Sequence, residues 1–273
     1  MSEQQRLALD ELLRTSPLDI GGDVAQQREN FDQMLTATPL ASDVQTAPGT
    51  LGAVPVVDVV IDPTASEVVL FLHGGAFAIG SATAGVPLAA DVARQSKARA
   101  ISVEYRLASE HPYPAALEDA VEAYRALIAA VDPEHISMVG ESAGGGLTIA
   151  TLLAIRDRGL PLPSSAAVFS PWVDLTLSGH SLGTKSDVDP VLTAAGLCLR
   201  ATDYTHGTDA RAASPLFADL SGLPALLIQV GSHEAFCATL FLAQYLDDGV
   251  VCQEKPQCGV RVLRPSATEM SRI

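Results

Sequence analysis

The sequence predicts an α/β fold, in which a mostly parallel sheet carries helices on both faces. Short apolar runs at 68–72, 100–103, 166–169 and 226–230 have the length and composition of buried strands. Segments with helical apolar spacing, such as 115–128, alternate with these runs. Apolar residues make up 48% of the chain, as expected when both faces of a sheet are covered. Strands that alternate with helices favour a doubly wound arrangement.

The N-terminal region is predicted to be helical and to lie outside the sheet. Residues 4–14 and 24–36 both carry apolar side chains at helical spacing, and prolines and glycines follow each segment. We expect these helices to form a mobile cap over a pocket, with a cap at 1–50 and a main domain at 51–273. The alternative is an extension that makes no contact with the site. An early strand of the main domain is predicted at 54–61.

A Gly-x-Ser-x-Gly motif at 140–144 follows the apolar run 136–139 and precedes a helix predicted from Leu147 to Arg158. In this strand–turn–helix setting, a sharp turn presents the serine hydroxyl above the sheet, where it can attack a carbonyl carbon. Glycines flank the serine because such a turn leaves no room for side chains. Ser142 is therefore the candidate nucleophile.

A second motif, His73-Gly74-Gly75, directly follows the buried run at 68–72. A glycine-rich loop after such a strand can present backbone N–H groups to a developing oxyanion. We predict that the N–H groups of Gly74, Gly75 and Ala143, the residue after the nucleophile, form this oxyanion hole. A single Gly-Gly pair is often an ordinary turn, but the two motifs in this order are far more specific. His73 is interpreted as a residue that holds the loop geometry.

Three segments, His73-Gly74-Gly75, Tyr105–Leu117 and Gly140–Gly145, resemble those of the hormone-sensitive-lipase-like family of α/β-hydrolases. Within this family, the resemblance is to bacterial esterases and monoterpene-lactone hydrolases in particular. Ser170–Thr176 and Ser214–Leu216 are also similar, and the resemblance runs from about Val56 to Glu234. It implies the α/β-hydrolase fold with an eight-stranded, mostly parallel sheet and an N-terminal helical cap. It also implies hydrolysis of short-chain carboxylic esters without a metal or cofactor. The loop reads His-Gly-Gly-Ala where the family has His-Gly-Gly-Gly, and both predicted glycine donors are present.

The resemblance also implies the acid of a catalytic triad, which follows the serine in the chain order Ser, acid, His. The buried run at 226–230 ends in Gly231, and the family places its acid three residues after this glycine. The residue at that position is Glu234, which is therefore the predicted acid. The alternative is a solvated carboxylate on a loop.

The triad histidine that the resemblance implies is missing. It would follow a helix predicted at 238–246 and a strand predicted at 260–263, but no histidine follows His233. By this alignment, Glu269 or a neighbour stands at the position of the base. A carboxylate is a weaker base for a serine hydroxyl because its ordinary pKa lies well below that of the histidine ring. Five other histidines lie in segments that do not favour the role of catalytic base: His111, His135, His180, His206 and His233.

Three explanations of the missing histidine stay open. In the first, the residues from about 235 onward are the result of a frame shift or truncation. Three of the four cysteines fall in this stretch. Alternatively, the chain is a hydrolase with impaired turnover. As a third reading, it is a catalytically inactive, receptor-like homologue that binds a small molecule, as gibberellin receptors of the same family do.

Composition limits the remaining function classes. The formal net charge of −15 argues against nucleic acid and anionic membranes as partners, since both require positive patches. No apolar run reaches the roughly 18 residues of a membrane span, and no signal-peptide core follows the polar N-terminus, so we expect a cytoplasmic protein. The four cysteines form no Cys-x-x-Cys pair, and no metal site is predicted. The expected partner is a small ester or lactone, and a homodimer is compatible with the sequence.

Overall fold

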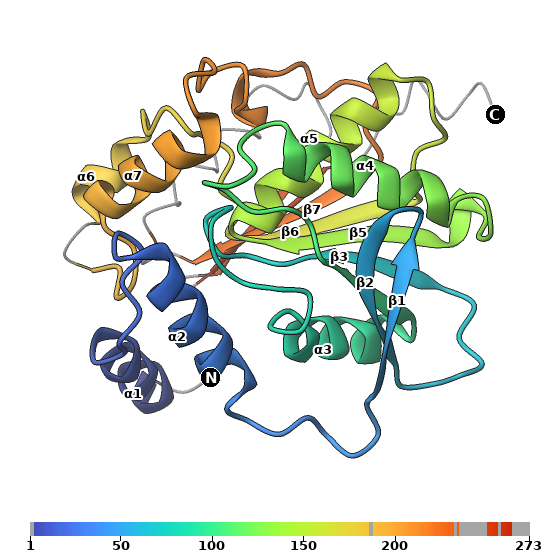
Figure 1. Ribbon diagram of the computed structural model, residues 1–273, viewed down its shortest axis with the longest axis horizontal. Coiled ribbons are helices and arrows are strands. Elements are labelled where there is room, and N and C mark those ends of the chain that lie inside the picture. The colour runs from blue at the N-terminus through green and yellow to red at the C-terminus, as the bar shows by residue number, and fades with distance from the viewer. Residues whose placement is uncertain (1–2, 186–187, 232–233, 235–249, 256–257, 264–273) are drawn as a thin grey trace.

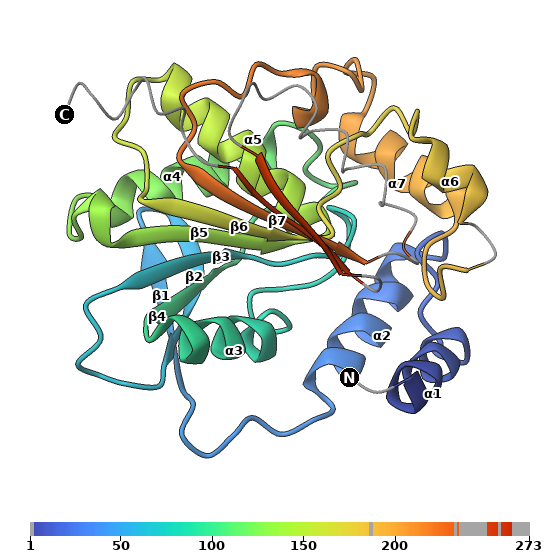
Figure 2. The ribbon, with the colours of Figure 1, turned by 180° about the vertical axis from the view of Figure 1, so that it is seen from behind.

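The computed structural model describes residues 3–185, 188–231, 234, 250–255 and 258–263 (Figure 1). Within these residues, one sheet of nine strands has the order β1-β2-β4-β3-β5-β6-β7-β9-β8. Helices α4 (Ala115–Leu127) and α5 (Ala143–Asp157) cover one face, and α3 (Val86–Ser96) covers the other (Figures 1 and 2). The predicted α/β fold is confirmed, with one strand more than the eight that the family resemblance implied.

The centre of the sheet is parallel and its edges are antiparallel. Neighbouring strands are parallel from β4 through β3, β5 and β6 to β7, whereas β1 and β2 at one edge, and β9 and β8 at the other, pair antiparallel. The predicted strands lie within two residues of the observed bounds. These bounds are β1 Gln45–Leu51, β2 Val54–Val60, β3 Val68–Leu72, β4 Arg99–Val103, β5 Ile136–Glu141, β6 Ser165–Phe169, β7 Ala225–Gly231, β8 Val250–Lys255 and β9 Cys258–Leu263.

The apolar runs of the sequence form a core on each face of the sheet. All five residues of β3 are buried, as expected for a parallel strand covered on both sides. Alternate side chains point to opposite faces, so Leu70 and Leu72 belong to the cluster under α4 and α5, whereas Val69 and Phe71 pack towards α3. This double burial anchors the strand that leads into the His73-Gly74-Gly75 loop.

The N-terminal helices α1 (Glu3–Arg14) and α2 (Val24–Thr36) lie outside the sheet, as predicted. β1 pairs with β2 along its whole length, so the sheet already begins at Gln45 and the predicted cap boundary at residue 50 is too late. No strand was predicted here because β1 contains Pro48 and Gly49, which are rare within strands. An edge strand tolerates proline, since one side of it has no ladder to complete.

Two further helices between β6 and β7 were not predicted, α6 (His180–Thr184) and α7 (Ala194–Thr205). They lie beside α2 at one end of the sheet in both views (Figures 1 and 2). Gly21, before α2, approaches Gly196 of α7 so closely that a side chain on it would meet the Gly196 backbone at 3.2 Å. Across the described ranges, no helix combines the length and apolar character that a membrane crossing requires.

Candidate active site

Ser142 lies in the sharp turn between β5 and α5, with φ +53° and ψ −121°. This left-handed conformation is costly for a residue with a side chain and persists only where the surroundings enforce it. The Ser142 N–H donates to the Phe169 carbonyl at 2.9 Å, and the Ser142 carbonyl accepts from the N–H groups of Gly146 at 3.1 Å and Trp172 at 2.8 Å. The Ser142 residue itself is only half-buried. Ser142 therefore lies in the predicted sharp turn, and its role as nucleophile stays a prediction.

The glycines on either side of Ser142 are required by close backbone packing. A side chain on Gly140 would collide with the Gly144 carbonyl. One on Gly144 would collide with the carbonyls of Leu72 and His73, at the end of β3. The serine turn and the glycine-rich loop therefore touch backbone to backbone, which brings together two motifs that lie far apart in the sequence.

We call residues 75–79 the oxyanion turn. The Gly75 carbonyl accepts from the N–H groups of Ala78 at 3.0 Å and Ile79 at 2.9 Å, which closes the turn. Gly75 has φ +118°, and a side chain on it would strike the Ile79 carbonyl. Ala76 stands where the family has its third glycine and adopts φ +51°. Within the described residues, the N–H groups of Gly75 and Ala76 make no hydrogen bond, as a donor to an oxyanion requires.

The structure corrects the prediction for Gly74. Its N–H donates to Oε1 of Glu141 at 2.9 Å and so is already used within the protein. Gly75 and Ala143 remain the predicted donors. Ala143 is the first residue of α5, where backbone N–H groups have no partner inside the helix. The sequence analysis did not identify Glu141, although a charged residue at the end of a buried strand signals a specific partner.

His73 holds the loop and is unsuited to act as the base. It is buried, its Nδ1 lies 2.7 Å from the Gly74 carbonyl oxygen, and its ring stacks on Tyr105 at 4.2 Å. The Tyr105 hydroxyl donates to the His73 carbonyl at 2.7 Å. Burial lowers the pKa of His73 to about 4, so its ring is neutral at physiological pH. These contacts agree with the structural role interpreted from the sequence.

Glu234 lies just beyond β7, two strands across the sheet from the strand that precedes Ser142. Burial raises the pKa of the Glu234 carboxyl, and a hydrogen bond from the Ser170 side chain partly opposes this shift. Its Oε2 atom is buried and has no hydrogen-bond partner among the described residues. Both Ser142 and Glu234 therefore follow the carboxyl ends of strands in the parallel part of the sheet. This arrangement is compatible with the predicted pairing, and the position of Glu234 as triad acid stays a prediction.

No histidine in the described part of the chain hydrogen-bonds to Ser142 or Glu234. Four of these histidines are exposed: His111, His135, His180 and His206. His135 lies at the opposite end of β5 from Ser142, where it pairs with Glu67 at 2.8 Å. His233, Glu269 and the helix predicted at 238–246 lie outside the described residues. The identity of the base therefore rests on the sequence alone.

The buried carboxyl of Glu141 gives a pH-dependent prediction. Burial is the main cause that raises its pKa, and the charge of Glu234 acts in the same direction. Because its pKa is raised in the folded state, the protonated Glu141 carboxyl stabilises the folded protein at pH values below its ordinary pKa. This stabilisation is lost as the pH rises through the pKa that the carboxyl has in the folded state. We therefore expect Glu141→Gln, which keeps an acceptor for Gly74, to stabilise the protein by about 1 kcal/mol at neutral pH but not in acid.

Urea unfolding of both proteins at acid and neutral pH measures this difference. The control is Glu29→Gln on the exposed side of α2, which we expect to change little at either pH. An equal effect of Glu141→Gln at both pH values would contradict the assignment.

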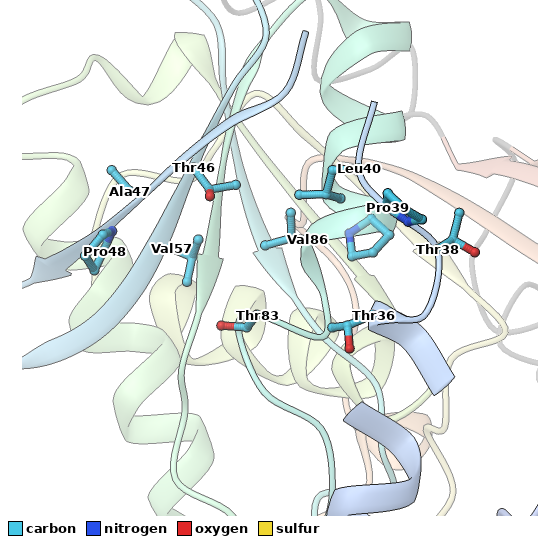
Figure 3. Close-up of a pocket in the computed structure, with 11 residues that line it drawn as sticks. Thr36, Thr38, Pro39, Leu40, Thr46, Ala47, Pro48, Val57, Thr83 and Val86 are labelled. Atoms are coloured by element: carbon cyan, nitrogen blue, oxygen red, sulfur yellow. The ribbon is translucent and has the colours of Figure 1, made fainter. Parts of the chain in front are cut away.

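A surface pocket of about 400 Å³ lies between the N-terminal segment and the edge of the sheet (Figure 3). Its lining comes from the segment after α2, from β1 and β2, and from the start of α3, and includes Leu40, Val57 and Val86. None of the predicted site residues lines it. In the described residues, no group of three or more His, Cys, Asp or Glu side chains is placed to hold a metal ion.

Comparisons with known proteins find α/β-hydrolases and esterases. Residues 69–240 match a family described as having the alpha/beta hydrolase fold. An acetyl-hydrolase from Streptomyces hygroscopicus is 45% identical over 168 residues, which cover 60% of this chain and 56% of that protein. An esterase from Acinetobacter venetianus is 35% identical over 212 residues, covering 76% of this chain and 70% of the esterase. The chain thus spans just over half the length of the acetyl-hydrolase.

Solved structures extend the likeness to the whole fold. EstE5, from a crystal soaked in ethyl alcohol, has a TM-score of 0.84 at 36% identity, covering 90% of this chain and 84% of EstE5. An esterase from the bacterial hormone-sensitive lipase family has a TM-score of 0.84 at 35% identity, covering 89% of this chain and 83% of that esterase.

Proposed function

The chain belongs to the hormone-sensitive-lipase-like family of α/β-hydrolases, and we propose that it hydrolyses short-chain carboxylic esters through an acyl-enzyme on Ser142. One observation carries this proposal: the strained serine turn packs directly against the loop whose Gly75 N–H has no partner among the described residues. A nucleophile and an oxyanion donor are thereby held side by side. The acetyl-hydrolase and esterase activities named for its relatives support the same chemistry.

In this mechanism, the Ser142 oxygen attacks the ester carbonyl carbon and gives its proton to a base. The carbonyl electron pair moves onto oxygen, where the N–H groups of Gly75 and Ala143 stabilise the negative charge, each by roughly 3 kcal/mol if well placed. Collapse of this intermediate breaks the bond to the alcohol oxygen, which takes the proton back from the base, and leaves the acyl group on Ser142. A water molecule then gives a proton to the base and attacks the acyl carbon. The carboxylic acid leaves, and the Ser142 oxygen takes up the proton from the base. The role of Glu234 is to orient the protonated base.

The general base of this site has not been identified. The sequence has no histidine after His233, where the family carries its triad histidine. A general base contributes about 10²–10⁴-fold to such a step. We therefore expect the chain to turn over short esters far more slowly than relatives with a complete triad, with a residual rate from the oxyanion hole and substrate binding.

A series of p-nitrophenyl esters with acyl chains of increasing length tests the proposal. We expect slow multiple turnover that is fastest for acetate and butyrate, and a small lactone assayed beside them extends the test to cyclic esters. Tight equilibrium binding of the esters without release of p-nitrophenol would contradict the proposal. That result would favour the receptor-like alternative, in which the site only holds a ligand.

A further inference from the structure

One arginine of the cap helix contacts the oxyanion turn. Arg28 lies on α2, and its Nε donates to the Ala78 carbonyl at 2.9 Å. Ala78 is fully buried, and its N–H closes the turn on the Gly75 carbonyl. One helical turn further along α2, the Asp32 carboxylate accepts a weaker hydrogen bond of 3.3 Å from the Ser81 hydroxyl. Helix α2 therefore contacts the chain at Ala78 and at Ser81, through two side chains on the same helix face.

The same guanidinium also binds the segment that supports the turn from the other side. Its Nη2 donates to the Ala108 carbonyl at 3.0 Å, and both Nη atoms bind the Glu110 carboxylate, at 2.6 and 2.8 Å. The Ala108 N–H in turn donates to the Phe77 carbonyl at 2.8 Å. Arg28 thus ties three segments together: the cap helix, the oxyanion turn and residues 108–110.

The oxyanion turn needs such support because its backbone is strained. Ala76 and Phe77 follow each other with φ of +51° and +61°, and left-handed conformations of this kind cost about 1–3 kcal/mol each. The Phe77 ring stacks on Tyr204 of α7 at 3.8 Å, which holds the side chain but not the carbonyls. Arg28 and the Ala108 N–H hold the carbonyls of two consecutive residues, Phe77 and Ala78.

We propose that Arg28 is a positioning residue that holds the oxyanion turn in the conformation in which Gly75 N–H can stabilise the oxyanion. The contact between α2 and the oxyanion turn then determines how strongly the oxyanion is stabilised, although Arg28 touches no reacting atom. This inference rests on the proposed function, because it assigns a purpose to the same turn. A displacement of about 1 Å at a catalytic group can cost about 10²-fold in rate, so a small relaxation of the turn suffices.

The ion pair with Glu110 does not by itself explain this arrangement. The side chains of Arg28 and Glu110 are 31% and 54% exposed, and pairs this accessible contribute little to stability. The specific part is the planar fork, which reaches two buried carbonyls and a carboxylate at once. A lysine ammonium cannot reproduce this geometry.

The test compares a trifluoromethyl ketone, which forms a tetrahedral oxyanion adduct with a serine, with the matching methyl ketone, which binds without much adduct. The ratio of their inhibition constants measures oxyanion stabilisation separately from ordinary binding. We expect Arg28→Met to reduce this ratio about tenfold and to lower kcat with little change in KM. Arg28→Lys is expected to behave like Arg28→Met, and it serves as the second variant if the first fails to fold.

Two further variants act as controls. Arg94→Met removes an arginine that is 34% exposed and pairs with Asp43 and Asp91 rather than with the oxyanion turn, and it should leave the ratio unchanged. Glu110→Gln keeps the bonds from Arg28 to both carbonyls and should change the ratio less than twofold. A ratio unchanged in both Arg28 variants would overturn this proposal alone. A wild-type protein that does not prefer the trifluoromethyl ketone would overturn the proposed function and this proposal with it.

Discussion

Added imidazole is expected to accelerate hydrolysis of p-nitrophenyl acetate by this protein at least about tenfold, and Ser142→Ala should abolish that acceleration. The sequence lacks the family's histidine, but it keeps the residues predicted as its two triad partners, Ser142 and Glu234. Ser142 is half-exposed in its turn, and Oε2 of Glu234 is a buried acceptor with no partner in the part of the chain that the structure describes. A free imidazole that donates its N–H to Oε2 of Glu234 would keep its other nitrogen unprotonated. That nitrogen would then act as the base that takes the proton from Ser142.

The comparison with Ser142→Ala matters because imidazole hydrolyses activated esters by itself. The rate of the Ser142→Ala protein at each imidazole concentration is therefore subtracted. The remaining rate should saturate with imidazole, and Glu234→Gln should weaken it because an amide cannot orient an imidazolium as a carboxylate does. Without imidazole, we expect Ser142→Ala to remove the slow turnover as well, because that turnover passes through the acyl-enzyme on Ser142. Equal acceleration of both proteins would contradict the assignment of Ser142.

Gly144→Ala is expected to destabilise the fold by more than about 3 kcal/mol, although the same change inside a helix usually stabilises by about 1 kcal/mol. Gly144 lies in the first turn of α5, and a methyl group there would overlap the carbonyls of Leu72 and His73. Relief requires the serine turn to move away from the end of β3. Both stability and the contact between the two catalytic motifs would then be lost.

Gly183→Ala is the matched control for this prediction. Gly183 lies in α6, and an added side chain would meet no atom within 4 Å. We expect it to be neutral or slightly stabilising in urea unfolding. Equal effects of the two substitutions would show that the backbone contact between β3 and α5 is not as close as described.

The sequence predicted the fold well where periodicity and motifs report burial directly. The run that became β3 is apolar because this parallel strand is covered on both faces, whereas β6 and β7 bury alternate residues. Ser142 sits in a motif whose glycines are required by backbone contact. Local sequence was less informative for β1, whose Pro48 and Gly49 are tolerated only because it is an edge strand. Helix α3 also escaped prediction, although Pro87 in its first turn is a helix-start signal.

The site was harder to predict in its details because these depend on contacts between distant residues. Gly74 was predicted as an oxyanion donor, and only the fold reveals that its N–H is taken by Glu141, 67 positions away. Arg28 meets its carbonyl partners 50 and 80 positions along the chain. No spacing rule of a single sequence encodes such pairs, whereas the serine turn is encoded locally.

Mass analysis of Ser142 after reaction with a short ester tests the central claim most directly. The protein is incubated with p-nitrophenyl acetate, quenched with acid and digested, and the peptides are sequenced by mass spectrometry. We predict a single acetyl group on the Ser142 hydroxyl, which is absent from the Ser142→Ala protein. Release of p-nitrophenol with no acetyl on Ser142, or with the acetyl group on another residue, would contradict the account.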